Sequence, residues 1–497
     1  MSLPMPPSPT RTTGQRRTIL IACCLAGALL PAASARAATS SHAASASRAA
    51  STSRRATASR AASSAYAPGQ ILVKYVTATP PRARAATARA AGAGDPVRTA
   101  PHTRLLRLAP GVSVAAALRR LRGRPDVAWA VPDYRARSAE AAPAAPGLIP
   151  NDVGNGGQPG DWQQLQWNFS GAFGVNAPQA WANVAAAGRP GGKGVVVAVL
   201  DTGVAYATHG RFLRSPDFSR YGFTGGYDFI AHNRFPNDRN GHGTFVAGTI
   251  AEATDNHYGL TGLAFAARIM PVRVLNTEGE GEASTIAEGV RYAVKHGAKI
   301  INLSLEFSSN VTAGDIPELI EALRFARRRG VLVVAAAGNE AHAAVAYPAR
   351  ARDVVAVGAT TEHGCLADYS NDGSGLTLVA PGGGADANLP GDPNCHPEGP
   401  AGRDVFQVTF TGASPRRFGM PGGYEGTSMA APHVAATAAL IVASGVLGSN
   451  PSPARIIARL RATARKLGGP GDASMYGAGL VDAAAATAPG GPGAVSG

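Results

Sequence analysis

The sequence predicts an α/β fold in which helices flank a mostly parallel β-sheet, preceded by a small α+β unit. Three observations support this fold class. Uniformly apolar, β-branched runs recur after residue 190, as expected of strands that are buried on both faces. Amphipathic segments that end at glycine separate these runs, and such alternation is typical of a parallel sheet. Before residue 137 the pattern changes to short alternating strands around one short helix.

The net charge is concentrated in the leading part of the chain. No Asp or Glu precedes Asp95, and residues 1–141 contain 21 Lys and Arg against 4 Asp and Glu. Residues 142–497 contain 26 basic residues against 28 acidic ones, so this larger part is close to neutral. A near-neutral body argues against nucleic-acid binding, and the length of 497 residues allows one to three domains.

Residues 1–35 are predicted to be a cleaved secretory signal. Arg16 and Arg17 precede an apolar run, 18–30, that is too short to span a bilayer, and a small-x-small pattern follows at 33–35. The paired arginines are also compatible with export through the twin-arginine pathway instead of the general secretory pathway. We therefore expect a secreted protein. We also expect no stable membrane span, because no later segment looks long and apolar enough to cross a membrane.

Residues 36–66 consist almost entirely of Ala, Ser, Arg and Thr, which predicts a disordered linker. Electrostatic retention at the cell envelope, or a role as a surface-attachment segment, is the alternative. The unit at 67–136 is predicted from a strand at 69–75, a helix at 114–121 and a strand at 127–131. A unit of this size is marginally stable alone.

A linker at 137–160, a globular domain at 161–488 and a flexible tail at 489–497 complete the predicted organisation. In the globular domain, buried strands are predicted at 194–200, 299–304, 331–335 and 354–358, with helices at 284–296 and 316–329. Ligand and catalytic sites of such folds form at the carboxyl ends of the parallel strands.

Two cysteines, Cys365 and Cys395, lie in the globular domain. They form one disulfide if the protein is exported, and otherwise they are two buried thiols.

Four side chains at predicted strand and helix ends suggest nucleophilic catalysis. Ser428 lies among small residues at the start of a predicted helix, where free N–H groups favour developing negative charge. A serine hydroxyl needs an adjacent base. Asp201 ends the first buried strand, His242 lies where a helix begins after glycine, and Asn339 follows the strand at 331–335. Taken singly, Asp201 also suits a turn, His242 suits a hydrogen-bonded core histidine, and Asn339 and Ser428 suit helix caps.

These segments resemble the subtilisin-like serine proteases (subtilases). The Asp201, His242 and Ser428 segments match the family's three catalytic motifs in the family's chain order, and residues 337–339 match its oxyanion motif. The similarity runs from about residue 167 to 485. It implies that Ser428 attacks a peptide carbonyl, that His242 shuttles the proton, and that Asp201 orients the imidazole. Asn339 would stabilise the oxyanion.

Residues 67–136 are similar to the family's inhibitory propeptide, which implies an autoprocessed zymogen whose own propeptide is an intramolecular inhibitor. The other expected partners are polypeptide substrates, the expected state is a monomer, and the chemistry requires no cofactor. Ala430 replaces the last glycine of a Gly-x-Ser-x-Gly elbow, which disfavours an esterase. A secreted pseudoprotease or binding protein on the same scaffold is the alternative.

The resemblance also implies the walls of a substrate cleft, formed by Ser304, Leu305, Glu306, Gly279, Gly281, Ala337 and Gly338. Glu306 stands where the family usually has glycine, and Phe245 stands where it often has a second histidine. We hypothesise that Glu306 and the glutamates of residues 278–282 favour basic substrate side chains, rather than being only solvated loop acids. Arg135 and Arg137 would then suit a self-cleavage site.

Many subtilases bind structural calcium, so the resemblance justifies a search for ligands. Asp217, Asp255 and Asn256 offer hard oxygen atoms from two loops and could share one ion. Asp228 and Asp238 could form a second site. The alternative for all five residues is a role in surface turns.

Overall fold

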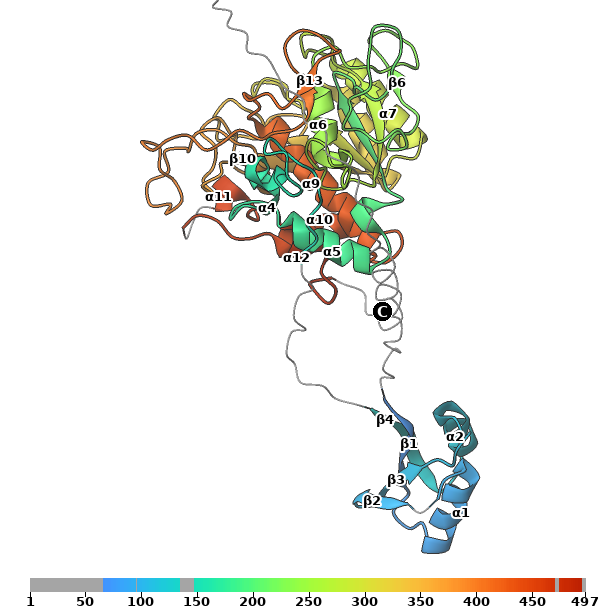
Figure 1. The fold of residues 1–497 in the computed structure, drawn as a ribbon. Helices are drawn as coiled ribbons and strands as arrows, with labels where there is room; N and C mark the ends of the chain where they lie inside the picture. The colour runs from blue at the N-terminus through green and yellow to red at the C-terminus, as the bar shows by residue number, and fades with distance from the viewer. Residues whose placement is uncertain (1–65, 95, 135–146, 470–472, 494–497) are drawn as a thin grey trace, which may run out of the picture. The chain divides into compact units, whose positions relative to one another are not determined.

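The computed structural model describes residues 66–94, 96–134, 147–469 and 473–493. It divides the chain into two compact units, with the boundary between residues 140 and 141 (Figure 1). The predicted signal, almost all of the Ala/Ser/Arg segment, and both Arg135 and Arg137 lie outside the described residues.

The first unit is a four-stranded antiparallel sheet in the order β2-β3-β1-β4, with two helices on one face (Figure 1). Alternate residues of β1, namely Ile71, Val73 and Tyr75, are buried against the helices. The predicted strands and the 114–121 helix are confirmed. The elements are β1 (Tyr66–Tyr75), α1 (Pro81–Ala91), β2 (Val97–Ala100), β3 (Thr103–Arg107), α2 (Val114–Leu121) and β4 (Val127–Tyr134).

The second unit contains a seven-stranded parallel sheet in the order β11-β10-β9-β8-β5-β7-β6. All four predicted strands are present because their β-branched runs are buried on both faces. The strands are β5 (Val196–Asp201), β6 (Tyr227–Asp228), β7 (Arg268–Arg273), β8 (Ile300–Leu303), β9 (Leu332–Ala336), β10 (Val354–Thr360) and β11 (Leu378–Pro381). A separate short pair consists of β12 (Thr409–Phe410) and β13 (Phe418–Gly419).

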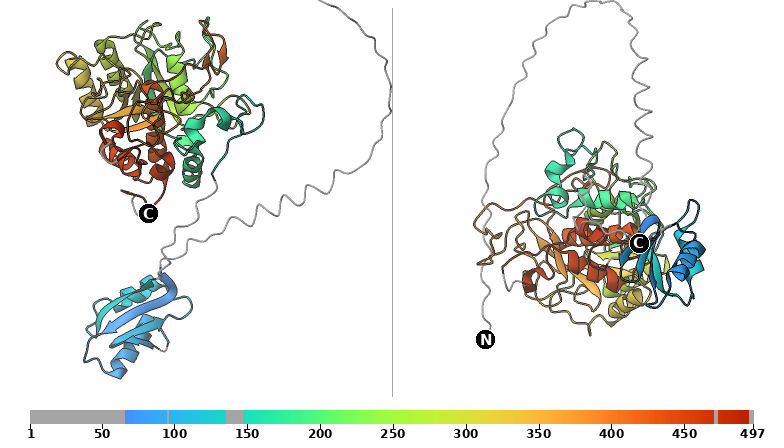
Figure 2. Two further views of the ribbon diagram at one scale, coloured as in Figure 1. Left: turned by 90° about the vertical axis from the view of Figure 1, so that its left-hand side faces the viewer. Right: turned by 90° about the horizontal axis from the view of Figure 1, so that it is seen from below.

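Helices cover both faces of this sheet, which confirms the predicted layers. Val197 and Val199 of β5 belong to the core that includes α5, α6 and α9, whereas Ala198 and Leu200 belong to the core that includes α7 and α8. In Figure 2 the first helices of the unit, in green, lie near its last ones, in red, and α5 packs against α12. The helices are α3 (Trp162–Leu165), α4 (Trp167–Ser170), α5 (Ala177–Ala186), α6 (His242–Ala251), α7 (Ala283–Lys295), α8 (Pro317–Arg328), α9 (Thr427–Ser444), α10 (Pro453–Thr463), α11 (Ala473–Tyr476) and α12 (Ala483–Thr487).

The central helix α9 is long and apolar enough to cross a membrane by length and composition alone. We expected no segment after the predicted signal to be long and apolar enough to cross a membrane, and this expectation was wrong. Most of α9 is buried against β8, β9, β10 and β11, so its apolar character is that of a core helix.

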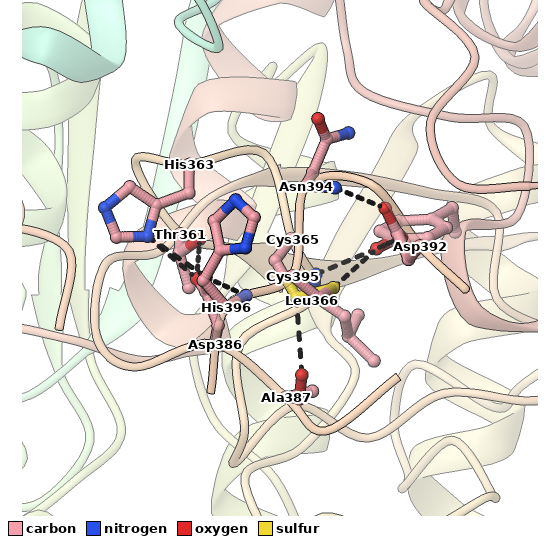
Figure 3. Close-up of a disulfide and its surroundings, with 11 residues drawn as sticks. Thr361, His363, Cys365, Leu366, Asp386, Ala387, Asp392, Asn394, Cys395 and His396 are labelled. Carbon is pink, nitrogen blue, oxygen red and sulfur yellow. Dashed lines mark hydrogen bonds and ion pairs between the residues drawn. A yellow bond between two sulfur atoms is a disulfide. The ribbon is translucent and has the colours of Figure 1, made fainter. Parts of the chain in front are cut away.

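Residues 147–160, which we expected to be linker, pack with the second unit. Pro150 and Asp152 are buried, and the Trp162 indole donates to the Pro150 carbonyl at 3.1 Å. The expected disulfide is confirmed, since Cys365 and Cys395 are bonded at 2.00 Å. Figure 3 shows the bridge beside Asp386, whose carboxylate accepts hydrogen bonds from Thr361 and His363.

Candidate active site

The four predicted catalytic side chains all lie at the carboxyl edge of the parallel sheet. Asp201 is the last residue of β5, His242 the first of α6, Ser428 the second of α9, and Asn339 follows β9. A cleft of about 530 Å³ opens at this edge. Its lining comprises Thr202, Asn240, His242, Leu275, Glu278, Gly279, Glu280, Gly281, Ile286, Ser304, Leu305, Glu306, Phe307, Ser308 and Ser428.

Asp201 and His242 form a hydrogen-bonded carboxylate–imidazole pair in the candidate active site. His242 Nδ1 lies 2.8 Å from Asp201 Oδ1, and the Asp201 side chain is completely buried while His242 is 26% exposed. Asp201 Oδ2 has no hydrogen-bond partner among the described residues, so this carboxylate depends on His242 and on the Thr202 N–H. Burial lowers the pKa of His242, but the Asp201 charge and hydrogen bond outweigh it, and the net shift is upward.

A buried carboxylate, Asp238, holds the segment that presents His242. It accepts hydrogen bonds from the hydroxyls of Thr202 and Thr244 at 2.9 and 2.6 Å, and from the N–H of Gly241. Asp228 is instead paired with Arg273, and both side chains are buried. Each carboxylate therefore has its own partners, and the hypothesis that they share a second calcium ion is not supported.

The nucleophile candidate lies at the amino end of α9. Ser428 Oγ donates to the Ser304 carbonyl at 3.3 Å, and Ser304 Oγ donates to the Ser428 carbonyl at 2.7 Å. Among the described residues, no hydrogen bond joins Ser428 to His242. Both side chains line the same cleft, however, and a rotation about one staggered bond redirects a serine Oγ. Catalytic hydrogen bonds often tighten only when substrate binds.

The Asn339 amide is held from both sides. Its Oδ1 accepts from the N–H and the hydroxyl of Thr427, at 2.8 and 2.9 Å. Its Nδ2 donates to Glu306 Oε1 at 3.1 Å, and its backbone N–H donates to Glu306 Oε2 at 2.9 Å. An amide NH₂ has two protons, so one N–H can still face a substrate oxygen.

Two residues that sequence reasoning missed support these groups from within the segment closed by the disulfide. The Tyr369 hydroxyl accepts from the Gly426 N–H at 2.9 Å, just before the nucleophile. Asn371 Oδ1 accepts from the N–H groups of Glu340 and His342, at 3.1 and 2.9 Å, just after the oxyanion candidate. Neither residue has a periodic or motif signal, because both act through loop contacts.

Five of the seven predicted wall residues line the cleft, namely Ser304, Leu305, Glu306, Gly279 and Gly281. Ala337 and Gly338, which precede Asn339, are buried instead. Gly338 has φ +115°, and a Cβ there would lie 2.2 Å from Asn371 Nδ2, so only glycine fits. Phe245 is buried and stacks on Tyr424, with ring centroids 4.3 Å apart.

The predicted metal ligands are only partly brought together. Asn256 Nδ2 lies 2.7 Å from Asp217 Oδ1, whereas Asp255 Oδ1 accepts from the Asn151 N–H on the surface. Asp152, which the sequence did not suggest, accepts from the N–H groups of Asp255 and Asn256. Across the described residues, no three His, Cys, Asp or Glu side chains form a metal-binding group.

Two buried carboxylates nevertheless offer oxygen ligands to a hard cation, whereas Asn256 turns its Nδ2 toward Asp217 and its Oδ1 accepts from the Tyr258 N–H. Asp217 and Asp152 are both fully buried, and neither is paired with Lys or Arg in the described part of the chain. Burial raises the pKa of Asp217 to about 8, and the Asp152 charge adds to this shift. Buried carboxylates normally need a paired cation, and calcium accepts carboxylate and amide oxygens.

Comparisons with known proteins agree with this geometry. A family model described as "Subtilase family" matches residues 192–479, and one described as "Fervidolysin N-terminal prodomain" matches residues 52–133. Subtilisin BL from Lederbergia lenta is 39% identical over 296 residues, covering 60% of this chain and 91% of that protein. Thermitase from Thermoactinomyces vulgaris is 35% identical over 297 residues, covering 60% and 88%.

Among solved structures, a protease from Pseudoalteromonas arctica matches with a TM-score of 0.54 and 32% identity, covering 68% of this chain and 98% of that one. The family model spans more than half of the chain. The chain therefore belongs to the subtilase family of serine-type endopeptidases and carries an N-terminal prodomain.

Proposed function

We propose that this endopeptidase is exported as a zymogen and cleaves peptide bonds through an acyl-enzyme, with Ser428 as nucleophile, His242 as base and Asp201 as orienting acid. The observation that carries this assignment is the 2.8 Å bond between His242 Nδ1 and Asp201 Oδ1, on the same cleft as Ser428. A base with one ring nitrogen held by a carboxylate presents the other to the nucleophile.

In the proposed reaction, Ser428 Oγ attacks the peptide carbonyl carbon while its proton passes to His242 Nε2. Asn339 Nδ2 and the Ser428 backbone N–H stabilise the oxyanion of the tetrahedral intermediate. Ser428 is the second residue of α9, and such N–H groups have no partner within the helix. The C–N bond then breaks, the leaving amine takes the proton from His242, and water hydrolyses the ester by the reverse sequence of proton transfers.

The zymogen proposal rests on the first unit. Trp129 and Val131 of β4 are 42% and 38% exposed, and they project from the face of the sheet opposite its core. An exposed apolar strand of this kind suits burial against another surface. We propose that residues 67–136 assist folding and occupy the cleft, and that self-cleavage occurs between 134 and 150. The leader-like residues 1–35 and the disulfide suit export. We further propose that the exported enzyme is a monomer.

N-terminal sequencing of the protein secreted by a host cell tests the whole proposal, when it is combined with hydrolysis of an unfolded protein substrate. We expect a mature form that begins between residues 135 and 151 and hydrolyses the substrate. A secreted, stable chain that retains residues 67–134 and hydrolyses nothing would contradict the proposal and favour a binding protein on this scaffold.

We also propose that Asp217 and Asp152 hold a structural calcium ion, with the Asn256 amide turned so that its oxygen, not its nitrogen, faces the ion. Removing calcium with EDTA is expected to lower the melting temperature on the order of 5–10 °C, since a ligand present far above its Kd contributes a few kcal/mol. Differential scanning calorimetry of the mature enzyme with and without EDTA measures this change. Asp217→Asn should abolish the EDTA effect, whereas the surface variant Asp255→Asn should preserve it. An unchanged melting temperature in EDTA would refute the site.

A further inference from the structure

The substrate cleft carries an excess of negative charge although the body of the chain is nearly neutral. Glu278 and Glu280, from the loop before α7, and Glu306, from the loop after β8, all line the cleft. Of the described residues that line the cleft, only His242 can become positive. Charges of one sign on the walls of a cleft raise the local concentration of ligands of the opposite sign.

Glu306 is the most deeply placed of the three. Its carboxylate accepts from the backbone and the side chain of Asn339, so it bridges the segment after β8 and the segment after β9. Glu306 Oε2 lies 2.5 Å from the position that a Cβ on Gly338 would occupy. The carboxylate therefore packs against Gly338, between the loop that follows β8 and the loop that follows β9, and we call this position the slot.

This half-buried carboxylate has no cationic partner in the described part of the chain. Burial raises the pKa of Glu306, the two Asn339 hydrogen bonds oppose that shift, and the neighbouring Glu340 adds to it, so that the net shift is upward. Both donors are neutral amides, which stabilise an anion less than a cation does. A positive group in the slot would supply the missing partner.

The slot adjoins the position of the substrate residue under attack. In the proposed reaction, the carbonyl oxygen of that residue faces Asn339 Nδ2, the same atom that lies 3.1 Å from Glu306 Oε1. The side chain of that residue therefore begins beside the Glu306 carboxylate. We propose that Glu306 determines specificity by pairing with a Lys or Arg side chain on the residue whose carbonyl is attacked, an inference that rests on the proposed function.

A matched pair of peptide substrates tests this inference, one with Arg and one with Leu at the attacked position. For the native mature enzyme, we expect kcat/KM to favour Arg. In Glu306→Gln, the Arg-to-Leu ratio of kcat/KM should fall on the order of 10- to 100-fold, because a partly buried charge pair is lost. Glu280→Gln, at the exposed rim, should lower the ratio only a few-fold, and only at low salt.

Glu288→Gln is the matched control, because it removes the same charge from the exposed outer side of α7. An equal loss of kcat on both substrates in Glu306→Gln would overturn the inference, since it would make Glu306 a residue that only positions Asn339. A native enzyme that hydrolyses peptides without preference for Arg or Lys would overturn it as well. Titration of active sites with a fluorophosphonate distinguishes these results from a failure of the proposed function. If the proposed function is wrong, no site will react with the probe.

Discussion

The Ser428→Ala variant is expected to hydrolyse peptides about 10⁶-fold more slowly than the native enzyme, a size known from the same substitution in a subtilisin, a relative of this chain. The reason is that the variant lacks the hydroxyl that, in the proposed reaction, gives its proton to His242 and attacks the carbonyl carbon. The variant should also remain a full-length precursor. Steady-state hydrolysis of a chromogenic peptide and electrophoresis of the secreted protein measure the two effects.

Ser444→Ala is a matched control, because it removes a hydroxyl from the other end of α9, where Ser444 Oγ donates to the Ile441 carbonyl and accepts from the Val446 N–H. This variant should process itself and hydrolyse peptides normally. The double variant of Ser428 and His242 should be no slower than Ser428→Ala alone, since residues that act as a unit are not additive. A Ser428→Ala protein that still releases its prodomain when purified from a protease-free host would contradict the assignment.

Asp201→Asn is expected to lower kcat/KM about 10⁴-fold, the size found for the equivalent change in other serine proteases with this triad. A neutral amide can present its NH₂ to His242 Nδ1 and stabilise the wrong tautomer, and it cannot stabilise the imidazolium. Because Asp201 is completely buried and close in shape to Asn, the fold should survive. Calorimetry of the variant checks that it does.

The residual activity of Asp201→Asn also has a pH signature. His242 accepts a proton only when it is neutral, so activity falls as the pH decreases through the pKa of His242. Asp201 raises that pKa while burial lowers it. Removing the charge should therefore move the acidic limb of kcat/KM to lower pH. An acidic limb that stays at the native position would show that Asp201 does not act through His242.

The sheet could be predicted from the sequence because its physical signal is local. The runs that became β5, β8, β9 and β10 are β-branched and uninterrupted, as burial on both faces requires. By contrast, β7 was missed because Pro271 and its terminal arginines break the pattern. The extent of α9 was also missed, since a helix that is apolar on every side and contains Pro432 shows no amphipathic period.

The proposed catalytic residues could be predicted to lie together because each lies at or after the end of a strand or near the start of a helix, and the carboxyl ends of parallel strands meet. Contacts between residues far apart in the sequence cannot be predicted from a local sequence pattern. Asp152 lies far along the chain from Asp217 and within a stretch that reads as linker, so only folding places them in one loop cluster. The bond between Glu306 and Asn339 likewise joins loops after two different strands, and nothing in either local sequence indicates it.

The most direct test of the central claim is mass spectrometry of the mature enzyme after reaction with a fluorophosphonate probe. We expect a single adduct on Ser428, formed rapidly in the native protein and slowly in His242→Ala, because the imidazole must accept the serine proton. An adduct on another residue, or labelling of Ser428 at the same rate without His242, would contradict the claim that these side chains form one catalytic unit.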